Sequence, residues 1–159
     1  MSSNYSDWVT HSDMVFPHDA NPLGTMFGGR VMQIMDVNSA IAAFRFCRMA
    51  AVTASSEPID FHTPISVGDV IEVRSRVVWT GRSSMIIRSE VFSENPLSGE
   101  RKLCTIGHMN FVAIGADGRP APVPELQIRN GEEQAHFDVG ARVREHIKNR
   151  REGGSNPVT

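Results

Sequence analysis

The sequence predicts an α+β fold in which one long helix is covered by a single antiparallel sheet. Three observations lead to this prediction. The run from Gly28 to Met49 has helical periodicity and is apolar on nearly every side, so other parts of the chain must cover it. Extended segments precede and follow it, and the later ones are joined by short, hairpin-like turns. Strands and helices do not alternate repeatedly, which argues against a parallel sheet.

Five strands are expected, each bounded by residues that favour turns. They span residues 8–15, 52–61, 69–80, 83–93 and 102–114. The third strand alternates most regularly, with Ile71 and Val73 on one face and Glu72 and Arg74 on the other. The segment 52–61 is the weakest of the five.

A single domain accounts for most of the chain, because 159 residues can bury enough surface to fold without a disulfide or a metal. The expected organisation is a disordered N-terminus at 1–7, a globular domain at 8–125, a C-terminal helical extension at 126–152 and a flexible tail at 153–159. A polar, weakly periodic helix is expected at 132–150, within the extension.

The composition excludes several functional classes. A net charge of −2 without a long basic run gives no electrostatic basis for broad binding to nucleic acid or to a membrane surface. The sequence shows no secretion signal and no apolar run long enough to span a bilayer, so the cytoplasm is the expected compartment. Cys47 and Cys104 stand alone, and no metal-binding spacing is present, so both are expected to be inert core thiols.

Asp36 is the single acidic residue between Gly28 and Met49. The polar side chains of this run share one arc of the helix: Arg30, Gln33, Asn38, Arg45 and Arg48. Asp36 lies outside that arc, on a stripe with Gly29, Met32, Ala40 and Ala43. A carboxylate on an apolar stripe costs several kcal/mol unless it is partnered or neutralised. Asp36 is therefore either a structural residue bonded to nearby backbone or a catalytic group.

Four segments resemble motifs of the hotdog-fold acyl-CoA thioester hydrolases. They are Asn21-x-x-Gly24-x-x-Phe27-Gly28-Gly29-x-x-Met32-x-x-Met35-Asp36, then Phe61-x-x-Pro64-Ile65-x-x-Gly68-Asp69, then Gly81-Arg82-Ser83-Ser84, and finally Phe111-Val112-Ala113 with the turn Asp117-Gly118-Arg119. The resemblance spans residues 8–125 in the right order. It implies one long buried helix wrapped by a curved antiparallel sheet, and hydrolysis of acyl-CoA to a free acid and coenzyme A without a metal or a redox cofactor.

The chemistry of the first motif agrees with this function. Gly28 and Gly29 begin the helix, so they offer unpaired N–H groups, the positive end of the helix dipole and close approach for a thioester oxygen. Without the resemblance they could be a simple helix start. Asp36 lies about 11 Å further along the helix and could act as a general base or as a nucleophile that forms a mixed anhydride. The resemblance implies that Asn21 positions the water or the carbonyl; otherwise it is an ordinary turn residue.

The resemblance also implies a second chain and a place for coenzyme A. Asn21 and Asp36 would meet across a homodimer, with a homohexamer, a trimer of dimers, as the full assembly. Coenzyme A would lie near Gly81, Arg82, Ser83 and Ser84, where the guanidinium suits a phosphate. A solvated hairpin turn is the alternative interpretation of this motif.

Two other functions remain as alternatives. One is a hotdog protein that binds acyl-CoA and regulates without turnover, against which a carboxylate such as Asp36 argues. The other is a hydratase or dehydratase, whose Asp/His pattern is not found. His62 and His108 show no readable partner, and the acyl-chain length is not determined, although Met26, Met32 and Met35 suggest an adaptable pocket.

Overall fold

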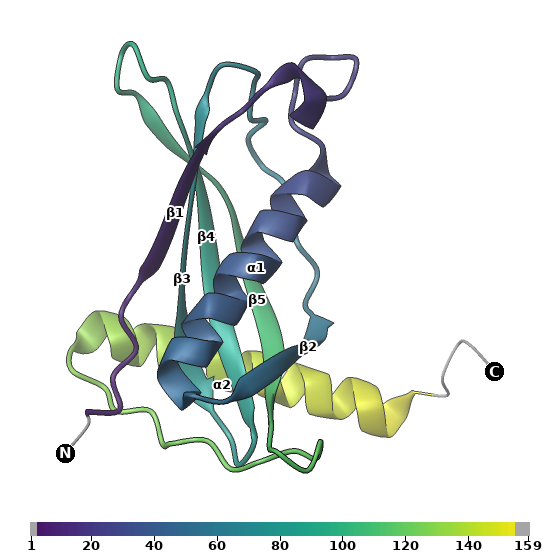
Figure 1. Ribbon diagram of the computed structural model, residues 1–159, viewed down its shortest axis with the longest axis vertical. Helices are drawn as coiled ribbons and strands as arrows, with labels where there is room; N and C mark the ends of the chain where they lie inside the picture. Colours follow the sequence, from purple (N-terminus) through teal and green to yellow (C-terminus); the bar gives the residue numbers. More distant parts are fainter. Residues whose placement is uncertain (1–2, 155–159) are drawn as a thin grey trace.

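A five-stranded antiparallel sheet with a helix on each face forms the structure, a computed structural model that describes residues 3–154 (Figure 1). The strands are β1 (Val9–Met14), β2 (Ala50–Ser56), β3 (Val70–Thr80), β4 (Ser84–Glu94) and β5 (Arg101–Ile114). They lie in the order β1-β3-β4-β5-β2, so β1 and β2 are the edges. The long helix α1 (Gly28–Cys47) packs on one face and α2 (Gly131–Gly153) crosses the other. This confirms the fold class predicted from the sequence.

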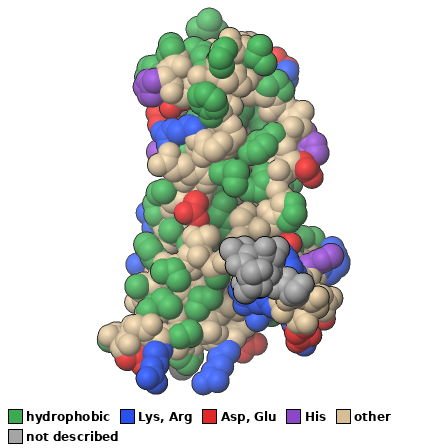
Figure 2. Space-filling model, turned by 90° about the vertical axis from the view of Figure 1, so that its right-hand side faces the viewer, with side chains coloured by type: hydrophobic (Ala, Val, Ile, Leu, Met, Phe, Trp, Pro, Cys, Tyr) green, Lys and Arg blue, Asp and Glu red, His purple; other side chains and the backbone are tan. Residues whose placement is uncertain are grey.

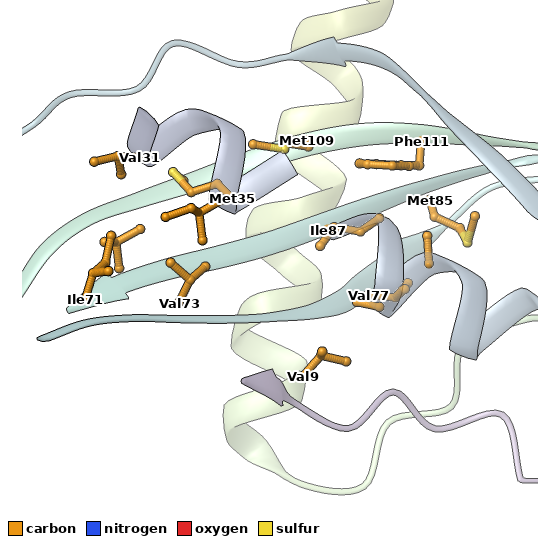
Figure 3. Packing of buried hydrophobic residues seen from close by; sticks show 14 of the residues in the cluster. Val9, Val31, Met35, Ile71, Val73, Val77, Met85, Ile87, Met109 and Phe111 are labelled. Atoms are coloured by element: carbon orange, nitrogen blue, oxygen red, sulfur yellow. The ribbon is translucent and has the colours of Figure 1, made fainter. Parts of the chain in front are cut away.

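Side chains that alternate along the strands fill the space between the sheet and α1 (Figure 3). They include Val9, Ile71, Val73, Val77, Met85, Ile87, Met109 and Phe111, which meet Val31 and Met35 of the helix. Val78 and Ile86 point to the opposite face and pack against Ile147 of α2. Because side chains of a strand alternate between faces, the same strands hold both helices.

Asn38 belongs to the polar arc of the helical wheel but does not face solvent. It is buried, and its amide Nδ2 donates to the carbonyl oxygen of Val9 at 2.9 Å and to Oγ of Ser75 at 2.9 Å. A polar side chain can be buried when the sheet supplies its hydrogen bonds, which a helical wheel cannot show. Asn38 therefore ties α1 to β1 and β3.

Part of α1 is not covered within one chain, although the sequence predicted a helix covered on most sides. Its exposed apolar side chains are Met32, Val37 and Phe44. Figure 2 shows hydrophobic side chains over much of the face that forms the right-hand side in Figure 1. An apolar area of this kind on a folded chain marks a surface for another molecule.

Two elements end earlier than predicted. The helix α1 ends at Cys47 because Arg48 adopts a left-handed conformation, with φ of 53°, that closes the helix. The strand β2 ends at Ser56. Residues 57–62 run beside β5 and are joined to it by separate hydrogen bonds rather than by a regular ladder. A short 3₁₀ helix, Pro17–Asp19, lies in the loop between β1 and α1.

Polar contacts connect the described part of the N-terminal segment to the rest of the chain. Oγ of Ser6 accepts a hydrogen bond from the N–H of Val77 at 2.9 Å, and Asp7 pairs with Arg129 at 2.8 Å. These contacts fix the segment against β3 and the start of α2. The predicted flexible tail begins at Gly153, the last residue of α2, and its residues 155–159 lie outside the described range, as do 1–2.

Neither helix in the described range is both long enough and apolar enough to cross a bilayer.

Candidate active site

Asp36 is held by a single side-chain partner at the edge of the sheet. Its Oδ1 accepts a hydrogen bond of 2.7 Å from Oγ1 of Thr53, which lies on the edge strand β2. The carboxylate is half-buried, and its Oδ2 accepts no hydrogen bond from residues 3–154. A hydroxyl that donates to one oxygen orients the carboxylate and leaves the other oxygen available. Thr53 was not identified from the sequence, because nothing local pairs a strand threonine with a helix 17 positions away.

A β-bulge aims Thr53 at the helix. Thr53 lies opposite Phe111, which belongs to the core beneath α1, whereas Ser55 lies opposite Asn110, with a register shift between them. In a regular strand, residues two apart point to the same face. The extra residue, Ala54, breaks that rule, so Thr53 faces α1 and Ser55 faces away. Bulges often re-aim side chains beside active sites in this manner.

The glycines at the start of α1 offer two unpaired N–H groups, as predicted. Among the described residues, neither Gly28 nor Gly29 donates a backbone hydrogen bond, whereas the following N–H groups of Arg30 and Val31 both bond to the carbonyl of Phe27. The first turn has no acidic residue and no side-chain cap. A Cβ added at Gly29 would meet nothing within 4 Å, so this end of the helix is open to an anion or a polarised carbonyl.

Asn21 is engaged within its own loop. Its Nδ2 donates to Oγ1 of Thr25 at 2.8 Å, and its Oδ1 accepts from the N–H of Leu23 at 2.9 Å. This is the local bonding expected of a turn asparagine. Within a single chain the structure does not bring Asn21 to Asp36.

Asp19 holds this loop against α1 and was missed by sequence reasoning. The buried carboxylate accepts from the N–H of Phe16 at 3.0 Å and from Nε of Arg30 at 3.2 Å. The hydrogen bond from Phe16, together with Arg30, keeps the pKa of Asp19 below its usual value despite burial. Its backbone carbonyl also accepts a hydrogen bond from the N–H of Phe27, so Asp19 holds in place the loop that leads into α1. Both carboxylate oxygens are occupied, which suits a structural role.

The hairpin predicted to bind coenzyme A joins β3 to β4. Arg82 is exposed, Ser84 is buried, and the N–H of Gly81 donates to the carbonyl of Ser84 at 2.8 Å. The carbonyl of Ser83 accepts the N–H of Ala113 at 2.9 Å. Figure 1 places this turn near the C-terminal end of α1, at the opposite end from the glycine pair. Within the described chain, no hydrogen bond links it to Asp36.

His108 offers no better base than Asp36. Burial, together with nearby Arg88, lowers the pKa of His108 to about 4, so its ring is neutral at pH 7. His108 also lies close to His136 of α2, on the side of the sheet that faces away from α1. No group of three His, Cys, Asp or Glu side chains suited to a metal ion occurs between residues 3 and 154.

Comparison with known proteins identifies the family. The profile of the thioesterase superfamily matches residues 23–100. An uncharacterized acyl-CoA thioester hydrolase of Bacillus subtilis is 36% identical over 143 residues, which cover 90% of this chain and 83% of that protein. This chain belongs to the thioesterase superfamily. The family indicated by the sequence motifs is thereby confirmed.

Solved structures of other thioesterases confirm the hotdog fold. Acyl-CoA hydrolase from Staphylococcus aureus, in complex with butyryl coenzyme A, coenzyme A and coenzyme A disulfide, superimposes with a TM-score of 0.89 at 30% identity, covering 96% of this chain and 93% of that one. An apo-hexameric acyl-CoA thioesterase has a TM-score of 0.86 at 36% identity, covering 91% and 92%.

Three variants of the Staphylococcus aureus thioesterase also match, with one aspartate, one asparagine or one threonine replaced by alanine. In that chain the asparagine precedes the aspartate by 15 positions and the threonine follows it by 17. In the present chain, Asn21, Asp36 and Thr53 have the same two spacings.

Proposed function

We propose that this protein hydrolyses acyl-CoA thioesters to a carboxylic acid and coenzyme A. The observation that carries the proposal is the carboxylate of Asp36, oriented by Thr53 and open on one oxygen, in a chain of the thioesterase superfamily. The shared spacing of Asn21, Asp36 and Thr53 supports these three as the polar residues of the site.

Each group has a distinct task in this proposal. The N–H groups of Gly28 and Gly29 stabilise the negative charge that develops on the thioester oxygen. Asp36 either removes a proton from the attacking water or attacks the carbonyl carbon itself to form a mixed anhydride, which water then cleaves. In both routes a C–O bond forms, the C–S bond breaks, and the departing thiolate takes up a proton. Thr53 holds the carboxylate in the reactive orientation.

We infer that two chains form each site. Gly29 and Asp36 lie on one helix, about 11 Å apart along its axis, whereas a nucleophile must approach the carbonyl carbon to about 3 Å. One chain's glycine pair therefore requires the Asp36 of another chain. The edge strand β2, which carries Thr53 and pairs only with β5, leaves its other side available for a second copy. Asn21 would then face the partner's Asp36.

A homodimer is accordingly the smallest active assembly that we propose, with a homohexamer, a trimer of dimers, as the complete one. The exposed apolar side chains of α1 give such an interface its hydrophobic part. The hexameric state of a thioesterase with the same fold supports the larger assembly.

Thiol release provides the direct test of this function. Purified protein is mixed with acetyl-, butyryl- or palmitoyl-CoA, and free coenzyme A is followed with a thiol-reactive dye. Catalytic release of coenzyme A from at least one substrate is expected. Saturable binding of acyl-CoA without any release would instead favour the regulatory, non-catalytic alternative.

Replacing Thr53 with valine is expected to lower kcat by about ten- to a hundredfold, because a hydrogen bond to a charged group contributes about 1.5–3 kcal/mol. Valine keeps the shape of the side chain and removes the hydroxyl. Thr53→Ser retains the hydroxyl and should keep most of the activity. Steady-state kinetics on one acyl-CoA measure both effects, and an unchanged kcat in Thr53→Val would exclude the orienting role.

Replacing Arg82 with alanine is expected to raise KM for acyl-CoA about tenfold while changing kcat much less. The exposed guanidinium on the hairpin is free to bind a phosphate of the nucleotide, remote from the reacting bond. An acyl-N-acetylcysteamine carries the thioester without the nucleotide, so its KM should not change. If both substrates lose activity equally, Arg82 has a structural or catalytic role instead.

A further inference from the structure

The ring of Phe61 covers the first glycine of the proposed oxyanion site. A Cβ added at Gly28 would lie 3.3 Å from Cε2 and 3.5 Å from Cζ of this ring, whereas the space beside Gly29 is open. The Phe61 side chain is 46% exposed within the chain. One face of the helix start is therefore closed by an aromatic side chain, and the other is accessible.

The backbone on both sides of Phe61 is anchored to β5. The carbonyl of Asp60 accepts a hydrogen bond of 2.6 Å from Oγ1 of Thr105, a buried residue. The N–H of His62 donates to the carbonyl of Cys104 at 3.1 Å. Two hydrogen bonds on either side of a single residue restrict its backbone, so the sheet fixes the backbone from which the ring projects, although no regular strand contains it.

The segment that carries Phe61 alternates like a strand beside α1. Ile59 packs against the core at Gly107, where Met35 of the helix also lies. Phe61, two residues after Ile59, points to the same helix and covers its first residue, Gly28. Met32 lies on α1 between Gly29 and Asp36 and is 40% exposed. Because Met32 follows Gly28 by four residues, the two lie on the same face of α1, and Phe61 and Met32 are therefore apolar side chains that succeed one another along this face of the helix.

We propose that Phe61 determines acyl-group specificity by limiting the space beside the α-carbon of the substrate. This inference rests on the proposed function. If the N–H groups of Gly28 and Gly29 hold the thioester oxygen, the carbonyl carbon and its two substituents lie within a few ångströms of the ring. The sulfur substituent continues into a polar pantetheine chain, whereas the acyl substituent is apolar. The aromatic surface therefore suits the acyl side.

The limited mobility of Phe61 predicts which acyl groups are disfavoured. A flexible side chain such as Met32 has three rotatable bonds and can repack around a branched group, whereas the planar ring of Phe61 turns about only two bonds from a backbone that is held on both sides. A methyl branch at the α-carbon should therefore clash, whereas a straight chain should pass. One methylene-sized difference in an apolar pocket changes kcat/KM by roughly 10- to 200-fold.

The experiment compares butyryl-CoA with its isomer isobutyryl-CoA, whose α-carbon carries two methyl groups instead of one ethyl group. The wild-type protein should prefer butyryl-CoA. Phe61→Ala should raise the ratio of kcat/KM for isobutyryl-CoA over butyryl-CoA by roughly tenfold or more, with Phe61→Leu intermediate. Leu97→Ala is the matched control, because Leu97 is an apolar residue that is 97% exposed on the β4–β5 turn. It should leave the ratio unchanged.

The outcomes separate this inference from the proposed function. A wild-type protein that releases no coenzyme A from any acyl-CoA overturns the proposed function and this inference together. An active wild-type protein whose substrate ratio is the same in Phe61→Ala, Phe61→Leu and Leu97→Ala overturns the inference alone. Thermal unfolding of each variant accompanies the kinetics, and the leucine variant provides the comparison if the alanine variant does not fold.

Discussion

Replacing Asp36 with alanine is expected to lower kcat by about 10²- to 10⁴-fold while the protein remains folded. The proposed reaction needs a carboxylate at this position as base or nucleophile, and alanine supplies neither. The fold should tolerate the change because the carboxylate has one side-chain partner, Thr53, and is half-buried. Removing such a charge leaves the melting temperature equal or raises it. Steady-state kinetics and thermal unfolding measure the two effects on the same sample.

The matched control for Asp36→Ala is Asp138→Ala. Asp138 is also a helical aspartate, but it is exposed on α2, and its side chain accepts a hydrogen bond from Gln134 of the same helix. Its replacement should leave kcat unchanged. A folded Asp36→Ala protein with near-normal turnover would contradict the mechanism, whichever route of attack is considered.

The sequence could single out Asp36 as a candidate site residue because the signal is local. A single acid on an apolar helical stripe can be read from spacing alone, as can the glycine pair that begins the helix. In the structure the N–H groups of the glycine pair are unpaired among the described residues, and Asp36 is half-buried on a stripe whose Met32 is exposed within one chain. Their catalytic roles remain predictions, which the kinetics above test.

Thr53 and Phe61 could not be predicted, because their places depend on contacts between distant segments. A bulge in β2 orients Thr53 toward Asp36, and no residue pattern predicts the extra residue at Ala54. Phe61 was noted as part of a motif, but its contact with Gly28 depends on hydrogen bonds to β5, more than 40 positions away. The same limit applies to Asn38, which lies on the polar arc of the helical wheel and is buried because β1 and β3 supply its hydrogen bonds.

Mixing Asn21→Ala with Asp36→Ala chains is expected to restore about a quarter of wild-type activity. If the two residues of one site come from different chains, neither variant alone forms an intact site. A mixed dimer has one site with both changes and one with neither. Random association at equal amounts makes about half of the dimers mixed, so roughly a quarter of all sites are intact. The two chains, carrying different tags, would be refolded together or co-expressed to allow exchange.

The structure makes this mixing experiment decisive about where the site lies. Within one chain, the side chain of Asn21 bonds to its own loop at Thr25 and does not reach Asp36, and the glycine pair is separated from Asp36 along the helix axis. A site within one chain would require that loop to move, and every site in the mixture would then remain defective. Two Asp36→Ala preparations with different tags serve as the control and should show no recovery. Mixed dimers that are isolated through both tags and still lack activity would exclude the shared site, whereas recovery near a quarter would establish that Asn21 of one chain works with Asp36 of another.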